Sequence, residues 1–293
     1  MNRILSPYFI NRECGSIESG SAYDCANPLQ GGAEPNVILL NFKDVLGTVD
    51  GSITNLIESL IIANGKTGFA YQGFGRSVTP QQEVIKLGNS QNLAKHQVGI
   101  VIFDRSQNAK NNIQNMMLGK FVAIVQGSVK DSTAFEVYGL NSGLELVPGV
   151  IQQLNENNGA YLVTLATGEN QAEAKLPRTL FDTDYATTLE YVQGLAFLPS
   201  ILNLNVLAAA TAGSTSFTVT GRNFFGGGAA SAIVVNGVKW VNQSSLVETT
   251  QTSVTVTDTQ LTFSSVALTA GTYKLKVTTS KGIAYSNVSV VVS

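Results

Sequence analysis

Residues able to carry acid–base or nucleophilic chemistry are scarce in this chain of 293 residues. Histidine is the side chain best suited to moving protons near neutral pH, and His96 is the only one present. It stands beside the apolar run Val98–Phe103, where we expect a position at the edge of a core or on the surface. Nucleophilic catalysis needs a base beside the nucleophile, so the sequence offers no Ser/His/Asp or Cys/His arrangement.

The two cysteines, Cys14 and Cys25, are separated by a stretch rich in Gly and Ser that could bring them together. A disulfide would form in oxidising surroundings, whereas two free thiols are the expected state in a reducing cytosol. A metal site would need more ligands nearby, and the only histidine, His96, is far away in the sequence. We therefore expect no metal site.

Two further patterns resemble functional motifs without meeting their requirements. Asp182 and Asp184 are two residues apart in a turn-like segment, which is typical of a solvated loop rather than of a catalytic carboxylate pair. Gly73–Arg76 has too few glycines for a phosphate-binding loop, and no Lys-Ser/Thr pair follows it. The sequence thus predicts no catalytic, cofactor-binding or metal-binding residues, no cofactor, and a protein that is not an enzyme.

The composition favours a protein that works inside an assembly. Apolar residues make up 44% of the chain and charged residues only 13%, where soluble domains carry about a quarter charged residues. A neutral polar surface loses little when another subunit covers it, because few charges must be desolvated. The net charge of −2 gives no basic footprint for nucleic acid or an anionic membrane.

Targeting signals are not recognisable. No apolar run approaches the roughly 18 residues that a membrane span needs, and Met1–Pro7 lacks the apolar core of a secretory signal. We expect the chain to be made and kept in a cytosol until something else releases it, with no membrane partner.

The chain divides into three parts. Residues 1–35 are rich in Gly, Ser, Asn and Pro, and are predicted to form an arm. Residues 36–197 mix helix and strand patterns and are predicted to form one domain. Residues 199–293 change to Ser, Thr, Val and Gly with little helical periodicity, and are predicted to form a second domain.

The first half of residues 36–197 contains a strand and an unusual excursion. Val37–Phe42 is predicted to be a buried strand, and Ile53–Ile62 a second strand or a short helix. Gly65–Ser90 is long, rich in Gly and interrupted by Pro80, with a few apolar residues that could pair as a hairpin. Long excursions from a compact domain are often functional, so this segment is a candidate interaction element.

The clearest helix is predicted at residues 107–118. Ser106 is a suitable N-cap and Gly119 a suitable C′ residue. The residues expected on its buried face, with the two methionines as core filler, are Ala109, Ile113, Met116 and Met117.

Three strands are predicted to follow the helix, at Phe121–Val125, Ala134–Tyr138 and Ala160–Leu165. In the second of them, apolar Phe135 and Val137 alternate with Glu136 and Tyr138. That alternation is typical of a half-buried antiparallel strand whose other face is available to a neighbour. These elements indicate an α+β or mainly β domain.

Short alternating segments in residues 199–293 predict about seven strands, which is the number in an immunoglobulin-like sandwich. One of them, Ala232–Trp240, is expected to be a hairpin turning at Asn236-Gly237. The segments Pro199–Ile201, Thr220–Phe224, Gly271–Val277 and Gly282–Ser286 resemble those of IPT/TIG domains. A second proline after Ile201, usual in that class, is missing, which bears on the stiffness of the linker and not on the fold.

Domains of the IPT/TIG class bind DNA in some transcription factors and serve as spacers or adhesive modules elsewhere. Five basic and two acidic residues give this domain a net charge of +3. Lys274 and Lys276 alternate onto one face of a strand, which is expected to be an ordinary solvated face rather than a binding patch.

The whole plan resembles the major tail tube proteins of long-tailed bacteriophages. It combines an arm, a β-rich domain with a helix and a long excursion, and an appended immunoglobulin-like domain; motifs such as Val122–Val125, Phe135–Gly139 and Gly159–Leu165 look like strands of that family. The resemblance implies a mainly β fold: an α+β N-terminal barrel or sandwich with one flanking helix, followed by a C-terminal immunoglobulin-like β-sandwich.

The functional part of that resemblance concerns assembly in a virion put together in the host cytoplasm. Copies would self-associate into rings that stack into a tube and meet other virion structural proteins, with residues 1–35 and 65–90 contacting neighbouring rings and residues 199–293 projecting outward. The first domain, which together with the arm has 13 basic and 18 acidic residues, would line a lumen that genomic DNA traverses without specific binding, because like charge prevents counterion-release binding.

Two other functions fit the same composition. A capsid decoration or head-fibre protein would use the first domain to cap capsomers, although a helix with a long excursion favours the stacked tube. A bacterial surface adhesin would use the second domain to bind glycans. The absent secretory signal counts against it, as does the lack of an aromatic cluster beyond Trp240 and its neighbours.

Overall fold

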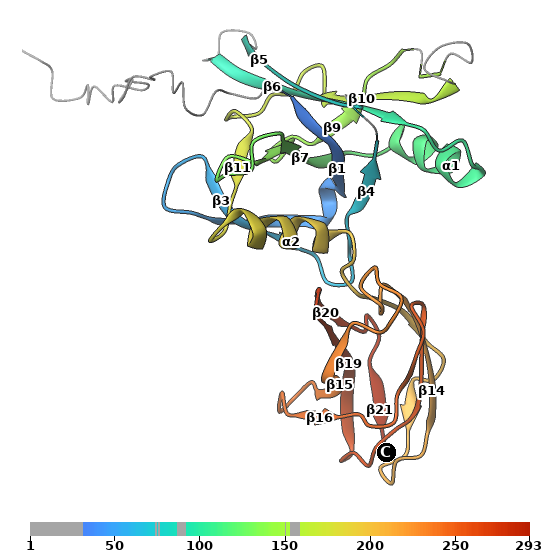
Figure 1. Ribbon diagram of the computed structural model, residues 1–293. Helices are drawn as coiled ribbons and strands as arrows, with labels where there is room; N and C mark the ends of the chain where they lie inside the picture. The colour runs from blue at the N-terminus through green and yellow to red at the C-terminus, as the bar shows by residue number, and fades with distance from the viewer. Residues whose placement is uncertain (1–31, 74, 76, 87–91, 150, 153–158) are drawn as a thin grey trace, which may run out of the picture. The chain divides into compact units, whose positions relative to one another are not determined.

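The computed structural model describes residues 32–73, 75, 77–86, 92–149, 151–152 and 159–293. Within these residues the chain is mainly β, as predicted: one 11-stranded sheet forms the first domain, and sheets of four and six strands form the second (Figure 1). Neither helix of the described part is long and apolar enough to cross a membrane. Most of the predicted arm, with Cys14 and Cys25, lies outside the described residues; its last three residues, 33–35, begin the first strand.

The first domain follows a fixed order of elements along the chain. They are β1 (Ala33–Asn41), a 3-10 turn (Phe42–Asp44), β2 (Val45–Asp50), β3 (Leu56–Ile62), β4 (Phe69–Gln72), β5 (Val78–Lys86), β6 (Asn92–Ile102), α1 (Gln107–Met116), β7 (Phe121–Gly127), β8 (Phe135–Tyr138), β9 (Leu144–Leu146), β10 (Tyr161–Thr167), β11 (Arg178–Leu180) and α2 (Tyr185–Leu195). The strand order is β2-β3-β11-β8-β7-β9-β10-β6-β5, and β1 pairs with both β7 and β4.

Strand β1 is buried on both of its faces. Val37 and Leu39 pack in a core shared with β6, β10 and α1, whereas Ile38 and Leu40 pack in a core closed by α2. Successive side chains of a strand point to opposite faces, so a strand between two cores has to be apolar at every position. The domain therefore has three layers, with β5, β6 and β10 on one side of β1 and β7, and α2 on the other (Figure 1).

Helix α1 begins at the predicted residue but ends earlier than predicted. The Ser106 hydroxyl accepts a hydrogen bond from the backbone N–H of Ala109, as an N-cap does. The helix ends at Met116, so Met117 is the C-cap, points away from the core and is 62% exposed. Met117 is thus not core filler, and Gly119 lies beyond the C′ position. The buried face is formed by Ala109, Ile113 and Met116.

Helix α2 was not predicted, so the expectation of one flanking helix was wrong. The Asp184 side chain accepts a hydrogen bond from the N–H of Thr187 at 2.8 Å and is the N-cap, not part of a simple solvated turn. The apolar pattern of the helix is weak because Thr188 and Gly194 are among its buried residues. The Thr188 hydroxyl is satisfied by the carbonyl of Asp184 at 2.7 Å.

The segment Gly65–Ser90 belongs to the sheet instead of leaving it. Strand β4 pairs with β1, and β5 pairs with β6 from Val78↔Ile100 to Lys86↔Asn92. The hairpin expected within this segment is wrong, because β4 and β5 pair with strands outside it, and the described part of the segment is not a loop outside the core. Residues 87–91 lie outside the described residues. The choice left open for Ile53–Ile62 is resolved as a strand, β3.

The second domain has two sheets. Its strands are β12 (Ser200–Leu204), β13 (Ala208–Ala209), β14 (Ser216–Arg222), β15 (Ile233–Asn242), β16 (Glu248–Thr250), β17 (Thr255–Val256), β18 (Gln260–Ser264), β19 (Gly271–Thr279), β20 (Gly282–Tyr285) and β21 (Val290–Val292). One sheet has the order β12-β14-β18-β17, and the other β13-β21-β19-β15-β16 with β20 beside β19.

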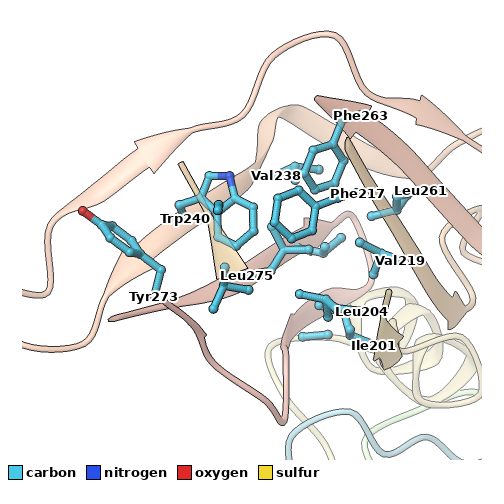
Figure 2. Packing of buried hydrophobic residues seen from close by; sticks show 14 of the residues in the cluster. Ile201, Leu204, Phe217, Val219, Val238, Trp240, Leu261, Phe263, Tyr273 and Leu275 are labelled. Carbon is cyan, nitrogen blue, oxygen red and sulfur yellow. The ribbon is translucent and has the colours of Figure 1, made fainter. Parts of the chain in front are cut away.

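The core of the second domain is built around one tryptophan. The rings of Phe217 and Phe263 lie 5.0 and 6.1 Å from Trp240, centroid to centroid, between the two sheets (Figure 2). The hairpin predicted at Asn236-Gly237 is wrong. Both residues lie inside the single strand β15, where the register against β19 shifts and Asn236 has φ of 59°. The Asn-Gly pair makes a bulge there because the residues on either side pair with the same neighbouring strand.

Candidate assembly surface

His96, the only histidine, lies within β6 and is 2% exposed, so it is neither a surface residue nor one at the core edge. Its Nδ1 accepts a hydrogen bond from the N–H of Gly139 at 3.1 Å, and its Nε2 lies 3.0 Å from the carbonyl oxygen of Lys175. A neutral ring protonated on Nε2 satisfies both contacts. Burial lowers the pKa of His96 to about 4, and the smaller effect of the Lys175 carbonyl raises it. With both nitrogens engaged, the imidazole fastens three chain segments together rather than serving as a base.

A buried glutamate continues this internal network. Glu173 accepts hydrogen bonds from the N–H groups of Asn141 at 2.8 Å and Ser142 at 2.9 Å. Burial raises the pKa of Glu173, while those two backbone bonds lower it. The backbone of Glu173 also pairs with Ala94 of β6. The sequence does not indicate Glu173, because a single acid between two alanines has no recognisable pattern.

Tyr138 belongs to the same buried region. Its ring packs edge-on against His96 at 5.5 Å, and the residue is 2% exposed. The predicted alternation of β8 is therefore wrong at Tyr138, whose hydroxyl donates to Glu136 at 2.6 Å. In the part of the chain that the structure describes, no group of three or more His, Cys, Asp or Glu side chains could hold a metal ion.

The chemistry that remains at the surface of the first domain is that of strand edges. Over the described residues the sheet ends at β2 and β5, and β4 pairs only with β1. Edge strands present unpaired N–H and C=O groups to other chains, and proteins protect them with charges, prolines or bulges. Strand β5 has Pro80 and Lys86, and β2 has Asp50 and two register shifts. Strand β4, Phe-Ala-Tyr-Gln, has no charge, proline or bulge.

Three hollows surround β4. One of about 580 Å³ lies towards α1 and has walls from Phe69, Tyr71 and Met116. A second of about 290 Å³ lies towards α2 and includes Ala70 and Gln72. The third, of about 520 Å³, follows the whole strand and reaches the end of β6. The strand that lacks protection is thus also the strand with room around it.

The surface near the end of α1 is apolar and basic, whereas that of α2 is acidic. Leu118, just after α1, is 91% exposed. Residues 104–120 have three basic residues and one acidic residue, whereas residues 181–198 have three acidic residues and no basic one. Opposite charges at two places on one domain favour association of one copy with the next in a head-to-tail manner.

The second domain shows a solvated charged strand face. Glu248 makes ion pairs of 2.8 Å with both Lys239 and Lys276. Hydrogen bonds from these two lysines lower the pKa of Glu248 to about 2. The ion pair with Glu248 therefore explains the position of Lys276 without a binding patch. Trp240 is fully buried, and its Nε1 donates to Gln251 at 3.0 Å, so its ring is not available to stack on a sugar.

Comparison with known proteins identifies the second domain. Residues 199–292 match the family model of the IPT/TIG domain, so the C-terminal part is an immunoglobulin-like module of that class. No curated protein matches the chain. Among solved structures, the Bacteroides ovatus mixed-linkage glucan utilization locus SGBP-B, in complex with a mixed-linkage heptasaccharide, is similar at 11% identity and a TM-score of 0.21. That similarity covers 74% of this chain and 60% of the other, so the chain spans less than two thirds of that structure's length.

Proposed function

We propose that this chain is a structural subunit that assembles with copies of itself into a tube, like the major tail tube proteins of long-tailed bacteriophages. The observation that carries the proposal is the edge of β4, which has no charge, proline or bulge, on a domain whose other edges in the described residues, β2 and β5, lie at the two ends of the sheet. A domain with edges at separate places can pair with one neighbour on each side, and such head-to-tail contacts generate rings or filaments.

The charge of the first domain fits a conduit for DNA. The arm and the first domain together, residues 1–198, have 13 basic and 18 acidic residues and a net charge of −5, and a wall of like charge does not hold a phosphate backbone by counterion release. In this proposal genomic DNA passes through the lumen without specific binding, and the subunit performs no catalysis. The virion, assembled in the host cytoplasm, is its location.

The IPT/TIG domain is proposed to decorate the outside of the tube. Its apolar core consists only of residues from Ile201 to Val292, whereas the two cores of the first domain use residues from Ala33 to Leu198. Separate cores allow the second domain to be present or absent without changing the first. A domain of this kind is suited to contacts outside the tube rather than to its wall.

Negative-stain electron microscopy tests the proposal. The full chain and a chain ending at Leu198 would be purified and imaged over a range of concentrations. We expect tubes of uniform diameter from both, with lateral projections only from the full chain. Monomers or trimers that never stack would exclude the tube and support the capsid decoration or head-fibre function instead.

A further inference from the structure

The three hollows around β4 have the arrangement left by a missing strand. Phe69 and Tyr71 line the hollow on the α1 side, whereas Ala70 and Gln72 line the hollow on the α2 side. The third hollow runs along β4 and is bounded opposite by Val101–Asp104, at the end of β6. A strand lying beside β4 would direct alternate side chains into the first and second hollows, because successive residues point to opposite faces.

The backbone hydrogen-bonding groups of β4 are also arranged for a further strand on its outer side. The N–H of Gly73 donates to Pro35 of β1, and the pairing continues as Val37↔Tyr71 and Leu39↔Phe69. In antiparallel pairs, alternate residues bond the same partner strand. The N–H and C=O groups of Ala70 and Gln72 therefore face away from β1, and within the described residues no backbone bond to them is formed.

The shape and chemistry of the slot define what can enter it. The slot has β4 on one side and β6 with α1 on the other, so it accepts a single extended segment more readily than the edge of a complete sheet. Each of its two side pockets has an apolar wall, formed by Leu39, Phe42 and Phe121 in one and by Ile38, Ile124 and Phe135 in the other, beside polar residues such as Asn112 and Gln126. A segment that fills both pockets must have consecutive apolar residues instead of an alternating pattern.

The chain itself contains such a segment outside the described residues. Tyr8-Phe9-Ile10 is a run of three apolar residues, and the remaining residues outside the described part contain no other run of three. The 22 Cα-to-Cα steps from Ile10 to Gly32 can extend over about 70 Å, which is enough to reach another subunit. Aromatic and β-branched residues also favour strand geometry.

We propose that Tyr8–Ile10 of one copy forms a strand beside β4 of a second copy, with Ala70 and Gln72 as its backbone partners. The partner is a second copy because the first described residues of a copy bond to β7, on the side of β1 opposite to β4. The Gly32 carbonyl accepts a hydrogen bond from Ser128, and Ala33 pairs with Gly127 of β7. Strand β1 separates that point from the slot. This inference rests on the proposed self-assembly and names the contact that links the copies.

Disulfide trapping tests the pairing in the full chain. With Cys14 and Cys25 replaced by serine, Phe9→Cys or Ile10→Cys is combined with Ala70→Cys or Tyr71→Cys. Residues side by side on neighbouring strands share a face and come close enough to bond. We expect Phe9→Cys to prefer one of the two β4 positions and Ile10→Cys the other, giving covalent dimers and larger species on non-reducing gels. Phe9→Cys with Thr220→Cys, an exposed site of the second domain, is the control.

A second measurement does not depend on new cysteines. Hydrogen exchange at the amides of Ala70 and Gln72 should be about tenfold or more faster in a Phe9→Asp variant than in the assembled wild type. Far-UV circular dichroism and the urea unfolding midpoint verify that the first domain of the variant is folded, because Trp240 lies in the core of the second domain. Equal exchange in the two proteins, cross-links no stronger than the control, or cross-links only within monomers would each overturn the inference. Tubes in the micrographs alongside such results would leave the proposed function standing, so the two failures are distinguishable.

Discussion

The backbone N–H of Gly139 donates a hydrogen bond of 3.1 Å to Nδ1 of His96, linking the end of β8 to β6. Gly139 has φ of +77°, and a Cβ there would lie 2.6 Å from the Leu144 side chain. Only glycine combines that conformation with that approach. The turn that orients this N–H is therefore set by a glycine, and the ring that accepts from it has to stay neutral.

Acid should destabilise the first domain through His96. Its pKa in the folded protein is about 4, below the ordinary 6.5, so between these values the unfolded chain binds a proton that the folded chain does not. Stability is complete above pH 6.5 and falls as the pH drops towards 4, by at most about 3 kcal/mol. The raised pKa of Glu173 acts in the opposite direction. Urea unfolding of the wild type at several pH values measures the slope.

The His96→Gln variant isolates the histidine from the carboxylates. A glutamine does not titrate, so the variant should lose the part of the pH dependence between 6.5 and 4 that belongs to His96. It should also be less stable than the wild type at pH 7. An unchanged slope in the variant would show that the ring is not the group responsible.

Glu173 should matter more than an exposed glutamate nearby. Glu173→Ala removes the buried acceptor of two partly buried hydrogen bonds, from the N–H groups of Asn141 and Ser142, which should cost about 2 kcal/mol of unfolding free energy. Glu169 is exposed and lies four residues before Glu173, in the same connection between β10 and β11. Glu169→Ala should therefore change stability by less than about 0.5 kcal/mol. Denaturation midpoints at pH 7 compare the two, and equal losses would contradict the anchoring role of Glu173.

Trp240 should report the unfolding of the second domain alone. It is the only tryptophan, it is fully buried, and its ring packs on Phe217. Phe217→Ala should reduce the unfolding free energy measured by tryptophan emission by about 3 to 5 kcal/mol. Val192→Ala, in the core of the first domain, should leave that emission transition in place while far-UV circular dichroism shows the first domain weakened. A joint shift of both signals in both variants would mean that the two cores unfold as one.

How far the fold could be predicted depended on how local its determinants are. Val37–Leu40 is apolar at four consecutive positions, which indicates a strand buried on both faces, and β1 is such a strand. Helix α2 was not predicted because Thr188 and Gly194 interrupt its apolar face. Asn236-Gly237 has the sequence of a tight turn, yet it forms a bulge because β19 pairs with the residues on both of its sides. In the last two cases tertiary packing overrode the local preference.

The candidate surface depended on longer-range relationships. Strand β4 has only four residues, and nothing in Phe-Ala-Tyr-Gln shows that its outer edge is free. That property follows from β1, whose other side is taken by β7, and from β6, whose neighbours are β5 and β10. Likewise, His96 and Glu173 are brought together by strand pairing across most of the domain, as the bridge between Ala94 and Glu173 shows. No local pattern contains this information.

A proline at Ala70 should separate folding from assembly. The N–H of Ala70 faces away from β1, so Ala70→Pro removes a group that the folded domain does not use, and prolines are tolerated on edge strands at such positions. The variant should keep the far-UV circular dichroism and most of the thermal stability of the wild type, yet fail to form large species in sedimentation velocity. Ala70→Ser, which retains the N–H, should assemble. Tyr71→Pro removes the N–H on the β1 side and should weaken the fold itself, by about 3 kcal/mol or more. A strand beside β4 would lose the hydrogen bond from the N–H of residue 70 in the Ala70→Pro variant. If that variant nevertheless assembled like the wild type, the outer edge of β4 would have no part in joining the copies.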